Sequence, residues 1–281
     1  MARPAQSPAR PGGTHRPAAG AAPRTRPAHG GTFATPFAPG GRAQLPPGAR
    51  PRLDPDWSEE AALWRRGYRL VAGIDEVGRG CLAGPVVSAA VILPPGWAPA
   101  GLRESKLLDA PARERLAVEV RAHAIAWALG VVDAPLIDRI DILQATLLSS
   151  MLAAARLPVQ PDALLLDSLL LPGVNVHQRA LVDADRRCAS VAAASVVAKV
   201  ARDGMMAAYA RRFPGYGFEV HKGYASPSHR EAIVRLGVSP IHRLTFASCI
   251  DVPPADQLDL WEEAVEEVVL DEVTIEDRAA G

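Results

Sequence analysis

The sequence predicts an α/β or α+β domain in which one β-sheet is flanked by helices. Three observations lead to this fold class. Two short apolar runs separated by a glycine-rich turn are typical of a β-hairpin, strand-like and helix-like segments then alternate, and 48% of the 281 residues are apolar, which is enough for a large core. The apolar runs are far shorter than the roughly 20 residues of a membrane-spanning helix. We therefore expect a soluble protein with no membrane partner.

The first elements follow from the spacing of apolar residues. Residues 69–75 and 84–93 are rich in Val and Ile and are bounded by glycines, so they predict two buried strands joined as a hairpin. Residues 111–130 begin with Pro111, carry apolar side chains at helical intervals and close on Gly130. This pattern predicts one helix across the whole segment.

The later elements alternate between helix and strand. A second helix is expected over residues 134–156, followed by a strand over 163–167 and a weaker strand over 177–183. Residues 190–212 are rich in Ala, which predicts a long helix whose small side chains allow close packing against a sheet. Residues 213–229 contain several glycines and predict a loop before a further helix.

The zero net charge of the chain hides three segments of different character. Residues 1–52 hold eight Arg, eleven Pro and no acid, which predicts a disordered basic tail. Residues 251–281 hold eleven acids and one Arg, and this acidic tail could form a short helix that docks on a partner. The nearly neutral remainder, residues 53–250, is expected to be the folded domain.

The role of the basic tail stays open between two alternatives. It lacks the apolar stretch of a secretory signal, and its prolines exclude the amphipathic helix of a mitochondrial transit peptide. An arm that neutralises nucleic-acid phosphates and a solvated extension both remain.

The cysteines indicate a reducing compartment. Cys81, Cys188 and Cys249 are widely separated and include no Cys-x-x-Cys pair, so they predict neither a disulfide framework nor a zinc site. We therefore expect a cytoplasmic protein.

Two adjacent acids at the end of the first strand are the strongest chemical signal. Asp75 and Glu76 stand in GIDEVGRG, directly before a turn in which Gly78 and Gly80 flank Arg79. Because neighbouring side chains of a regular strand point to opposite faces, we expect the strand to stop or bulge here. The glycines would let a polynucleotide backbone approach closely, with Arg79 facing phosphate or sugar.

Two more carboxylates follow later strands. Asp167 ends the run of leucines at 164–166, and Asp185 follows the weak strand, with Asp183 as a competitor for the same role. A carboxylate at the end of a buried strand is costly unless it is paired or binds a metal. Carboxylate oxygens without a His or Cys cluster suit Mg²⁺ or Mn²⁺, which could activate water against a phosphodiester.

Lysine is rare enough in this chain to be informative. The 28 Arg residues contrast with only Lys106, Lys199 and Lys222, which suggests that each lysine stands where a compact ammonium is needed. Lys199 is one helical turn before Asp203, so we expect a structural ion pair there. Lys222 lies in the loop 213–229, among aromatic and basic residues suited to stacking on a base or sugar beside a phosphate. His221 and His229 lack a third ligand at metal spacing, so zinc is not expected.

Together these motifs resemble ribonuclease HII. The resemblance covers about residues 70–250 and rests on five segments: GIDEVGRGCLAGPVVSAAVIL at 73–93, ESK at 104–106, LLLD at 164–167, AASVVAKVARD at 193–203 and HKGYAS at 221–226. It implies a ribonuclease H-like catalytic domain, with a mixed five-stranded sheet flanked by helices and a C-terminal helical part. It further implies a monomeric, Mg²⁺- or Mn²⁺-dependent endonuclease that acts in ribonucleotide excision repair.

The resemblance also implies the substrates, the products and the site residues. The substrates would be the RNA strand of RNA–DNA hybrids and single ribonucleotides in duplex DNA, cut on their 5′ side to leave 3′-hydroxyl and 5′-phosphate ends. It assigns metal binding and catalysis to four acids and substrate binding to six other residues. The acids are Asp75, Glu76, Asp167 and Asp185, and the substrate-binding residues are Gly78, Arg79 and Gly80 near the 2′-hydroxyl, Lys106 and Lys222 near phosphate, and Tyr224 beneath the next deoxyribose.

The chain departs from the family pattern at three places. Ser168 stands where the family usually has Gly, and Leu107 replaces the second lysine of Ser-Lys-Lys. Around the fourth acid the usual Lys-Gly-Asp becomes Asp183, Ala and Asp185, so an anion replaces a cation. We align Asp185 by its ten-residue distance before Ser195 and expect the added charge to strengthen metal binding or raise a neighbouring pKa.

Three alternatives were weighed against this function. Ribonuclease HIII would need a folded N-terminal domain, which residues 1–52 cannot form. A binding module that had lost catalysis would lack some of the acids, and all four are present. An interaction protein organised by the acidic residues 251–281 would account only for that tail.

Overall fold

A computed structural model describes residues 54–249, and within them a mixed five-stranded sheet forms the centre. The strand order is β3-β2-β1-β4-β5, with β1 antiparallel to β2, β2 antiparallel to β3, and β1, β4 and β5 parallel. This confirms the predicted sheet. The tails predicted at 1–52 and 251–281 lie outside the described residues. The strands are β1 (Val71–Val77), β2 (Val86–Ile92), β3 (Ala126–Val132), β4 (Ala163–Asp167) and β5 (His177–Leu181).

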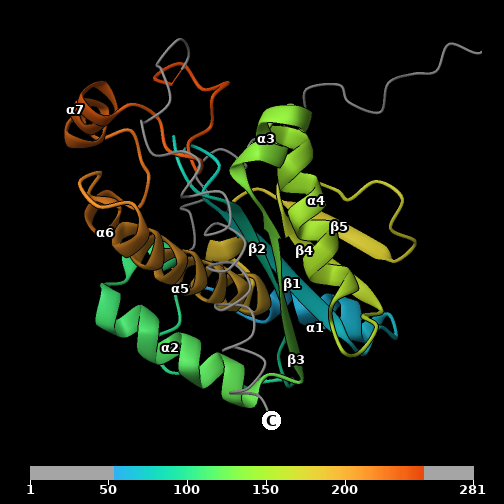
Figure 1. Ribbon diagram of the computed structural model, residues 1–281. Helices are drawn as coiled ribbons and strands as arrows, with labels where there is room; N and C mark the ends of the chain where they lie inside the picture. Colours follow the sequence, from blue (N-terminus) through green and yellow to red (C-terminus); the bar gives the residue numbers. More distant parts are fainter. Residues whose placement is uncertain (1–53, 250–281) are drawn as a thin grey trace, which may run out of the picture. The chain divides into compact units, whose positions relative to one another are not determined.

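Helices cover both faces of the sheet (Figure 1). One face packs against α5, with α2 outside it, and the other packs against α4. None of the described helices is long and apolar enough to cross a membrane. The helices are α1 (Ser58–Arg65), α2 (Ala110–His123), α3 (Ala134–Ile140), α4 (Ile142–Ala155), α5 (Ala189–Arg212), α6 (Phe218–His221) and α7 (Pro227–Leu236), with 3-10 turns η1 (Ser105–Leu107) and η2 (Ala184–Arg186).

Glycines in two strands let the helices lie close to the sheet. A Cβ atom on Gly73 of β1 would stand 2.2 Å from the carbonyl carbon of Ser190 in α5. A Cβ atom on Gly130 of β3 would stand 1.8 Å from the carbonyl oxygen of Ser149 in α4. Both contacts are with backbone, so only glycine fits at these positions.

The predicted hairpin is confirmed, but the predicted break in its first strand is wrong. Asp75 and Glu76 pair in regular register with Ala89 and Ser88, and β1 runs on to Val77. The reason is the antiparallel partner: β2 supplies hydrogen-bonding groups beyond the point where β4 stops pairing on the other side of β1. The two acids therefore lie on opposite faces of the sheet.

The helix predicted over residues 111–130 is also partly wrong. The helix α2 ends at His123, and residues 126–132 form the edge strand β3, which pairs along the full length of β2. The local apolar spacing suits either structure, and pairing with an open sheet edge decides between them. Gly130 serves close packing against α4 and does not end a helix.

The helix predicted over residues 134–156 is divided in two at Asp141. Asp141 adopts a left-handed φ of 71°, and its carboxylate accepts hydrogen bonds from the N–H groups of Leu143 (2.8 Å) and Gln144 (2.9 Å). This side chain caps the start of α4 and so ends α3. The strand at 163–167 and the helix at 190–212 are confirmed, with α5 starting one residue earlier.

No sequence pattern indicated α1, in which a buried acid caps the start of another helix. Glu60 Oε1 accepts hydrogen bonds from the N–H (2.9 Å) and the hydroxyl (2.7 Å) of Ser190 at the start of α5. Burial raises the pKa of Glu60. The contact with Ser190 stabilises this short helix. Because Ser190 is 130 residues away in the chain, no local pattern could indicate the helix.

Candidate active site

Two of the predicted site carboxylates stand directly after the last paired residues of the neighbouring parallel strands β1 and β4. β1 and β4 pair through Ile74 and Leu166, so Asp75 and Asp167 are the next two residues at the same end of the sheet. Parallel strands bring their carboxyl ends together, which is where ligands bind in open sheets of this kind. The topology thus brings together two acids that are distant in sequence.

The third strand of the parallel set delivers Asp185. The 3-10 turn η2 follows β5, and within it the N–H of Ala184 donates to Asp167 Oδ1 at 3.1 Å. Asp185 is only 6% exposed, whereas Asp183 is exposed and adopts a left-handed φ of 54°. Of the two competing acids, the structure therefore buries Asp185 beside the site.

Glu76 approaches from the other face of the sheet. It lines a small pocket together with Asp167 and with Leu147 of α4. Its Oε1 lies 3.1 Å from Nη1 of Arg79, in an ion pair across the start of the turn. Burial raises the pKa of Glu76, and the Arg79 charge opposes that rise.

The electrostatics of the cluster are those of anions held close together. Burial raises the pKa of Asp75 well above its ordinary value, and the charges of Glu76, Asp185 and Asp167 raise it further. Burial also raises the pKa of Asp185 to about 6, with Glu104 and Asp167 adding to the rise, and Asp183 contributes a smaller part. The four predicted acids are thus close enough to affect one another.

The donor set fits a divalent cation that prefers oxygen. In the described part of the chain, no three His, Cys, Asp or Glu side chains are close enough to form a ready-made metal site. A divalent cation among the four carboxylates would offset both their mutual repulsion and the cost of their burial. Oxygen donors alone suit Mg²⁺ or Mn²⁺.

Lys106 faces the acids from the 3-10 turn η1. Burial lowers its pKa, but the charges of Asp185, Glu104 and Asp75 outweigh that effect, so the pKa is raised overall. Its Nζ lies 3.5 Å from Glu104 Oε1, while Glu104 Oε2 lies 3.3 Å from Nε of Arg186. Glu104 was not among the predicted site residues, although it stands next to Ser-Lys in the ESK segment.

The glycine-rich turn after β1 is paired with the segment that carries Tyr224. Cys81 and Tyr224 form an isolated antiparallel bridge, and the N–H of Leu82 donates to the carbonyl of Gly223 at 2.8 Å. Tyr224 is 42% exposed. The structure therefore places Tyr224 next to the Gly78–Gly80 turn.

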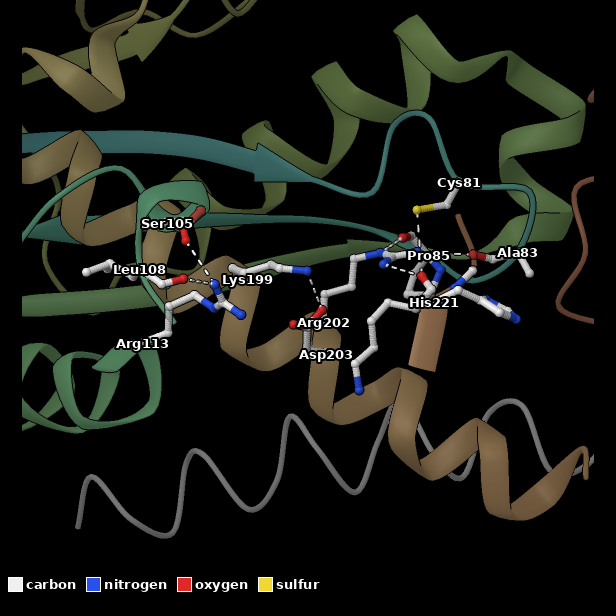
Figure 2. A network of polar contacts seen from close by, with 12 residues as sticks. Cys81, Ala83, Pro85, Ser105, Leu108, Arg113, Lys199, Arg202, Asp203 and His221 are labelled. Carbon is white, nitrogen blue, oxygen red and sulfur yellow. Dashed lines mark hydrogen bonds and ion pairs between the residues drawn. The ribbon is translucent and has the colours of Figure 1, made fainter. Parts of the chain in front are cut away.

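Two buried arginines that the sequence analysis did not identify lie beneath this turn. Arg202 of α5 donates to the carbonyls of Pro85 (2.9 Å), Lys222 (2.9 Å) and Ala83 (3.1 Å), as Figure 2 shows in part. Arg243 likewise contacts only backbone carbonyls in the hydrogen bonds that the structure describes for it. No local pattern marks an arginine for burial, because its partners lie far away in the chain.

The loop expected at 213–229 contains the short helix α6 and the start of α7. Two aromatic residues of this loop, Tyr216 and Phe218, are buried and stack on each other, so the substrate stacking expected of the loop's aromatic residues does not include these two. The reason is that the glycines turn the chain back on itself and direct the rings inward. The expected ion pair of Lys199 with Asp203 is confirmed at 2.7 Å.

Two neutral histidines, His242 and His229, form a hydrogen-bonded series that ends at the backbone carbonyl of Tyr224. The N–H of Ser239 donates to His242 Nδ1 (2.8 Å), so His242 carries its proton on Nε2, 3.1 Å from His229 Nε2. His229 must then carry its proton on Nδ1, which donates to the carbonyl of Tyr224 at 2.8 Å. Burial lowers the pKa of His229 to about 4 and that of His242 to about 3.

Because the pKa values of His229 and His242 are lowered in the folded protein, we expect the free energy of unfolding to fall in mild acid. The unfolded chain takes up protons near pH 6.5, whereas the folded rings stay neutral down to about pH 4. Their contribution is therefore complete above pH 6.5 and is lost as pH falls towards 4, at about 2 kcal/mol for each ring by pH 5. Urea unfolding at pH 7.5 and pH 5 measures this loss. His229→Gln should reduce the difference between the two pH values; an unchanged difference would contradict the prediction.

Ser168 adopts the conformation that glycine favours. Its φ is 65°, in the left-handed region, and its hydroxyl donates to Asp167 Oδ1 at 3.2 Å. The left-handed backbone of Ser168 is strained for a residue with a side chain. Its hydrogen bond orients the Asp167 carboxylate.

Comparisons with known proteins agree with this geometry. A family model described as Ribonuclease HII matches residues 72–249. The ribonuclease HII of Chloroflexus aurantiacus is 49% identical over 202 residues, which cover 70% of this chain and 95% of that protein. The ribonuclease HII of Thermus thermophilus is 50% identical over 194 residues, covering 69% of this chain and 94% of that protein.

Solved structures share the fold. The ribonuclease H2 of Pyrococcus horikoshii has a TM-score of 0.56 and 22% identity, covering 71% of this chain and all of that one (100%). The RNase HII structure of Archaeoglobus fulgidus, solved as a complex with PCNA, has a TM-score of 0.54 and 26% identity, covering 63% and 95%. At these identities the likeness supports the architecture of the described domain.

Proposed function

Because the chain belongs to the ribonuclease HII family and is a ribonuclease H type 2 endoribonuclease, we propose that it cuts on the 5′ side of single ribonucleotides embedded in duplex DNA. It also cuts the RNA strand of RNA–DNA hybrids. We propose that both reactions leave 3′-hydroxyl and 5′-phosphate ends and that the first begins the removal of ribonucleotides from DNA. The observation that carries this proposal is the cluster of carboxylates, Asp185 buried and the other three partly buried, beside a glycine-rich turn in which Arg79 and Gly80 are exposed.

The four carboxylates would hold the divalent cations that the family requires. Asp75, Glu76, Asp167 and Asp185 supply only oxygen donors, which suits Mg²⁺ and Mn²⁺ alike. Divalent ions bound there would lower the pKa of an attacking water and neutralise charge on the scissile phosphate. The contribution of the protein is to hold these partly buried charges near one another, against their own repulsion.

Other side chains would position the substrate. Lys106 is 80% exposed and faces the acids, so its ammonium can reach a phosphate that lies over them. Arg79 is exposed and can exchange Glu76 for a phosphate or sugar oxygen. Tyr224 presents an exposed ring next to the turn, where a deoxyribose can stack, and Lys222 stands beside it for the flanking phosphate.

The function is tested with an end-labelled DNA duplex that contains one ribonucleotide. We expect a single nick on its 5′ side in Mg²⁺ or Mn²⁺, and a 3′ end that a DNA polymerase can extend. The matched all-DNA duplex should stay intact, and a chelator should stop the reaction. Cutting on the 3′ side, or cutting that persists in the chelator, would refute the proposal.

A substitution at Gly80 tests how closely the substrate approaches the turn without disturbing the fold. Gly80 is exposed, has no positive φ, and a Cβ atom added there would meet no atom within 4 Å. Gly80→Ala should therefore change the free energy of unfolding by less than about 0.5 kcal/mol. Because the added methyl group would stand where the substrate backbone approaches, we expect at least about a tenfold loss in kcat/KM. Unchanged kcat/KM would show that the substrate does not approach this residue closely.

A further inference from the structure

We propose that Arg243 is a positioning residue that orients the peptide groups of the Gly78–Gly80 turn towards the 2′-hydroxyl of the ribonucleotide. The inference rests on the proposed function and adds to it the residue that sets the direction of the recognition groups. Arg243 lies in the segment after α7 and does not itself face the substrate, since its side chain is fully buried (0% exposed).

The buried guanidinium is bonded to the backbone of the turn. Its Nη2 donates to the carbonyl of Gly78 at 2.7 Å, and its Nη1 donates to the carbonyl of Arg79 at 2.8 Å. Nη2 and Nε also donate to the carbonyl of Gly84, at 2.8 Å and 3.1 Å. One side chain thus fixes both ends of the loop from β1 to β2.

The direction of the carbonyl groups decides the direction of the N–H groups. The described residues include no cis peptide bond, and in a trans peptide the C=O and the N–H point opposite ways. The carbonyl of Gly78 points inward to Arg243, so the N–H of Arg79 points outward. The same holds for the carbonyl of Arg79 and the N–H of Gly80. Two successive N–H donors are therefore presented on the exposed side of the turn, an arrangement that binds anionic or hydroxyl oxygens.

A second arginine restricts the same turn from the α5 side. A Cβ atom on Gly78 would lie 2.2 Å from Nε of Arg202, so this side chain fills the space directly beneath the turn. Arg202 holds the carbonyls of Ala83 and Pro85, while Arg243 holds those of Gly78 and Arg79. The two arginines together leave the peptide groups of the turn little freedom to rotate.

The residue type fits this role better than a merely structural one. Arg243 is fully buried (0% exposed), and this burial lowers its pKa to about 10, as expected where removing a charge from water is costly. An apolar side chain of similar volume would fill the space without that cost. The planar fork of Arg243 bonds three carbonyls through three separate nitrogens, a fixed geometry that an apolar residue lacks and that the single nitrogen of a lysine does not reproduce.

The test compares binding of two duplexes that differ by one 2′-hydroxyl. Fluorescence anisotropy in Ca²⁺ gives the Kd for a duplex with a single ribonucleotide and for the matched all-DNA duplex. For Arg243→Lys we expect the preference for the ribonucleotide duplex to fall at least about tenfold, while the Kd for all-DNA changes less than about twofold. Arg156→Lys is the matched control, because Arg156 also donates to a backbone carbonyl, that of Leu129 at 3.1 Å, but on β3. This control should keep the full preference.

Chemical rescue separates positioning from folding. Arg243→Ala leaves a space lined by the carbonyls, and added guanidinium ion should restore the preference, whereas urea of similar shape but no charge should not. If Arg243→Lys keeps the wild-type preference, or if guanidinium restores the melting temperature of Arg243→Ala without restoring the preference, the inference is overturned. Failure of the proposed function would look different: the wild-type protein itself would show no preference for the ribonucleotide.

Discussion

Replacing Asp75 with Asn is expected to abolish cleavage and at the same time to make the metal-free protein more stable. The loss should be at least about a thousandfold in kcat, because Asp75 is the most strongly perturbed acid of the cluster and a neutral amide is a poor ligand for a divalent ion. Binding of the duplex should persist, since the residues proposed to contact the substrate are unchanged.

The gain in stability follows from the sign of the pKa shift. The pKa of Asp75 is raised in the folded state, so the folded protein binds more protons than the unfolded chain above pH 3.8. Stability contributed by the protonated carboxyl is then lost as pH rises through the folded-state value. The neutral Asn removes this penalty, and the melting temperature in a chelator at pH 7 should rise by several degrees (on the order of 2–4 °C per kcal/mol). A lower melting temperature would contradict the account of the cluster.

Asp162 provides a matched control, because its pKa is lowered in the folded protein whereas that of Asp75 is raised. Its Oδ2 accepts hydrogen bonds from the N–H groups of Arg69 and Leu70, both at 2.9 Å, and these bonds lower its pKa. Its contribution to stability is present above pH 3.8 and is lost as pH falls through the lower folded-state value. Asp162→Asn should therefore reduce the melting temperature at pH 7 and leave cleavage intact. The pair of variants separates a carboxylate that serves function from one that serves the fold.

Gly73→Ala is expected to be among the most destabilising single substitutions in the domain. The added Cβ would lie 2.2 Å from the carbonyl carbon of Ser190 and 2.3 Å from the nitrogen of Val191. Both atoms belong to the backbone of α5 and cannot move aside like a flexible side chain, so β1 and α5 must separate. We expect a loss of more than about 3 kcal/mol in the free energy of unfolding, measured in urea.

The same substitution should also affect the site. Gly73 is two residues before Asp75 on the strand that delivers two of the four acids, so any Gly73→Ala protein that still folds should lose kcat as well as stability. Gly130→Ala makes an equally close backbone contact, with the carbonyl oxygen of Ser149 at 1.8 Å, but on β3 and α4. Its folded fraction should keep nearly full kcat. A Gly73→Ala protein within about 0.5 kcal/mol of the wild type would show that the strand and helix are less tightly packed than the structure indicates.

Several parts of the fold and site could be predicted from sequence because the signal was local. The strand of leucines ending on Asp167, the hairpin, and the Ala-rich helix follow from apolar periodicity within a few residues. Of the three rare lysines, Lys106 lies near the site carboxylates, and the glycines around Arg79 marked a turn whose arginine pairs with Glu76. Family resemblance selected Asp185 over Asp183, and the structure buries the former and exposes the latter.

The remainder could not be predicted because it depends on neighbours in space. Residues 126–132 became a strand only because β2 offered an open edge, and the regular pairing of Asp75 and Glu76 with β2 kept straight a strand that was expected to break. Arg243 and His242 are buried by partners from distant parts of the chain, and a charged or polar residue has no local pattern that foretells burial.

By itself, the sequence determined which acids are candidates for the site, where glycines leave the backbone without side chains, and to which family the chain belongs. Only the tertiary structure decided how these pieces meet: which faces of β1 carry the two acids, and which buried arginine donates hydrogen bonds to the inward-pointing carbonyls of Gly78 and Arg79. The physical reason is that periodicity reports the exposure of a side chain along its own element, whereas the energy of a buried charge depends on partners that the fold brings from elsewhere.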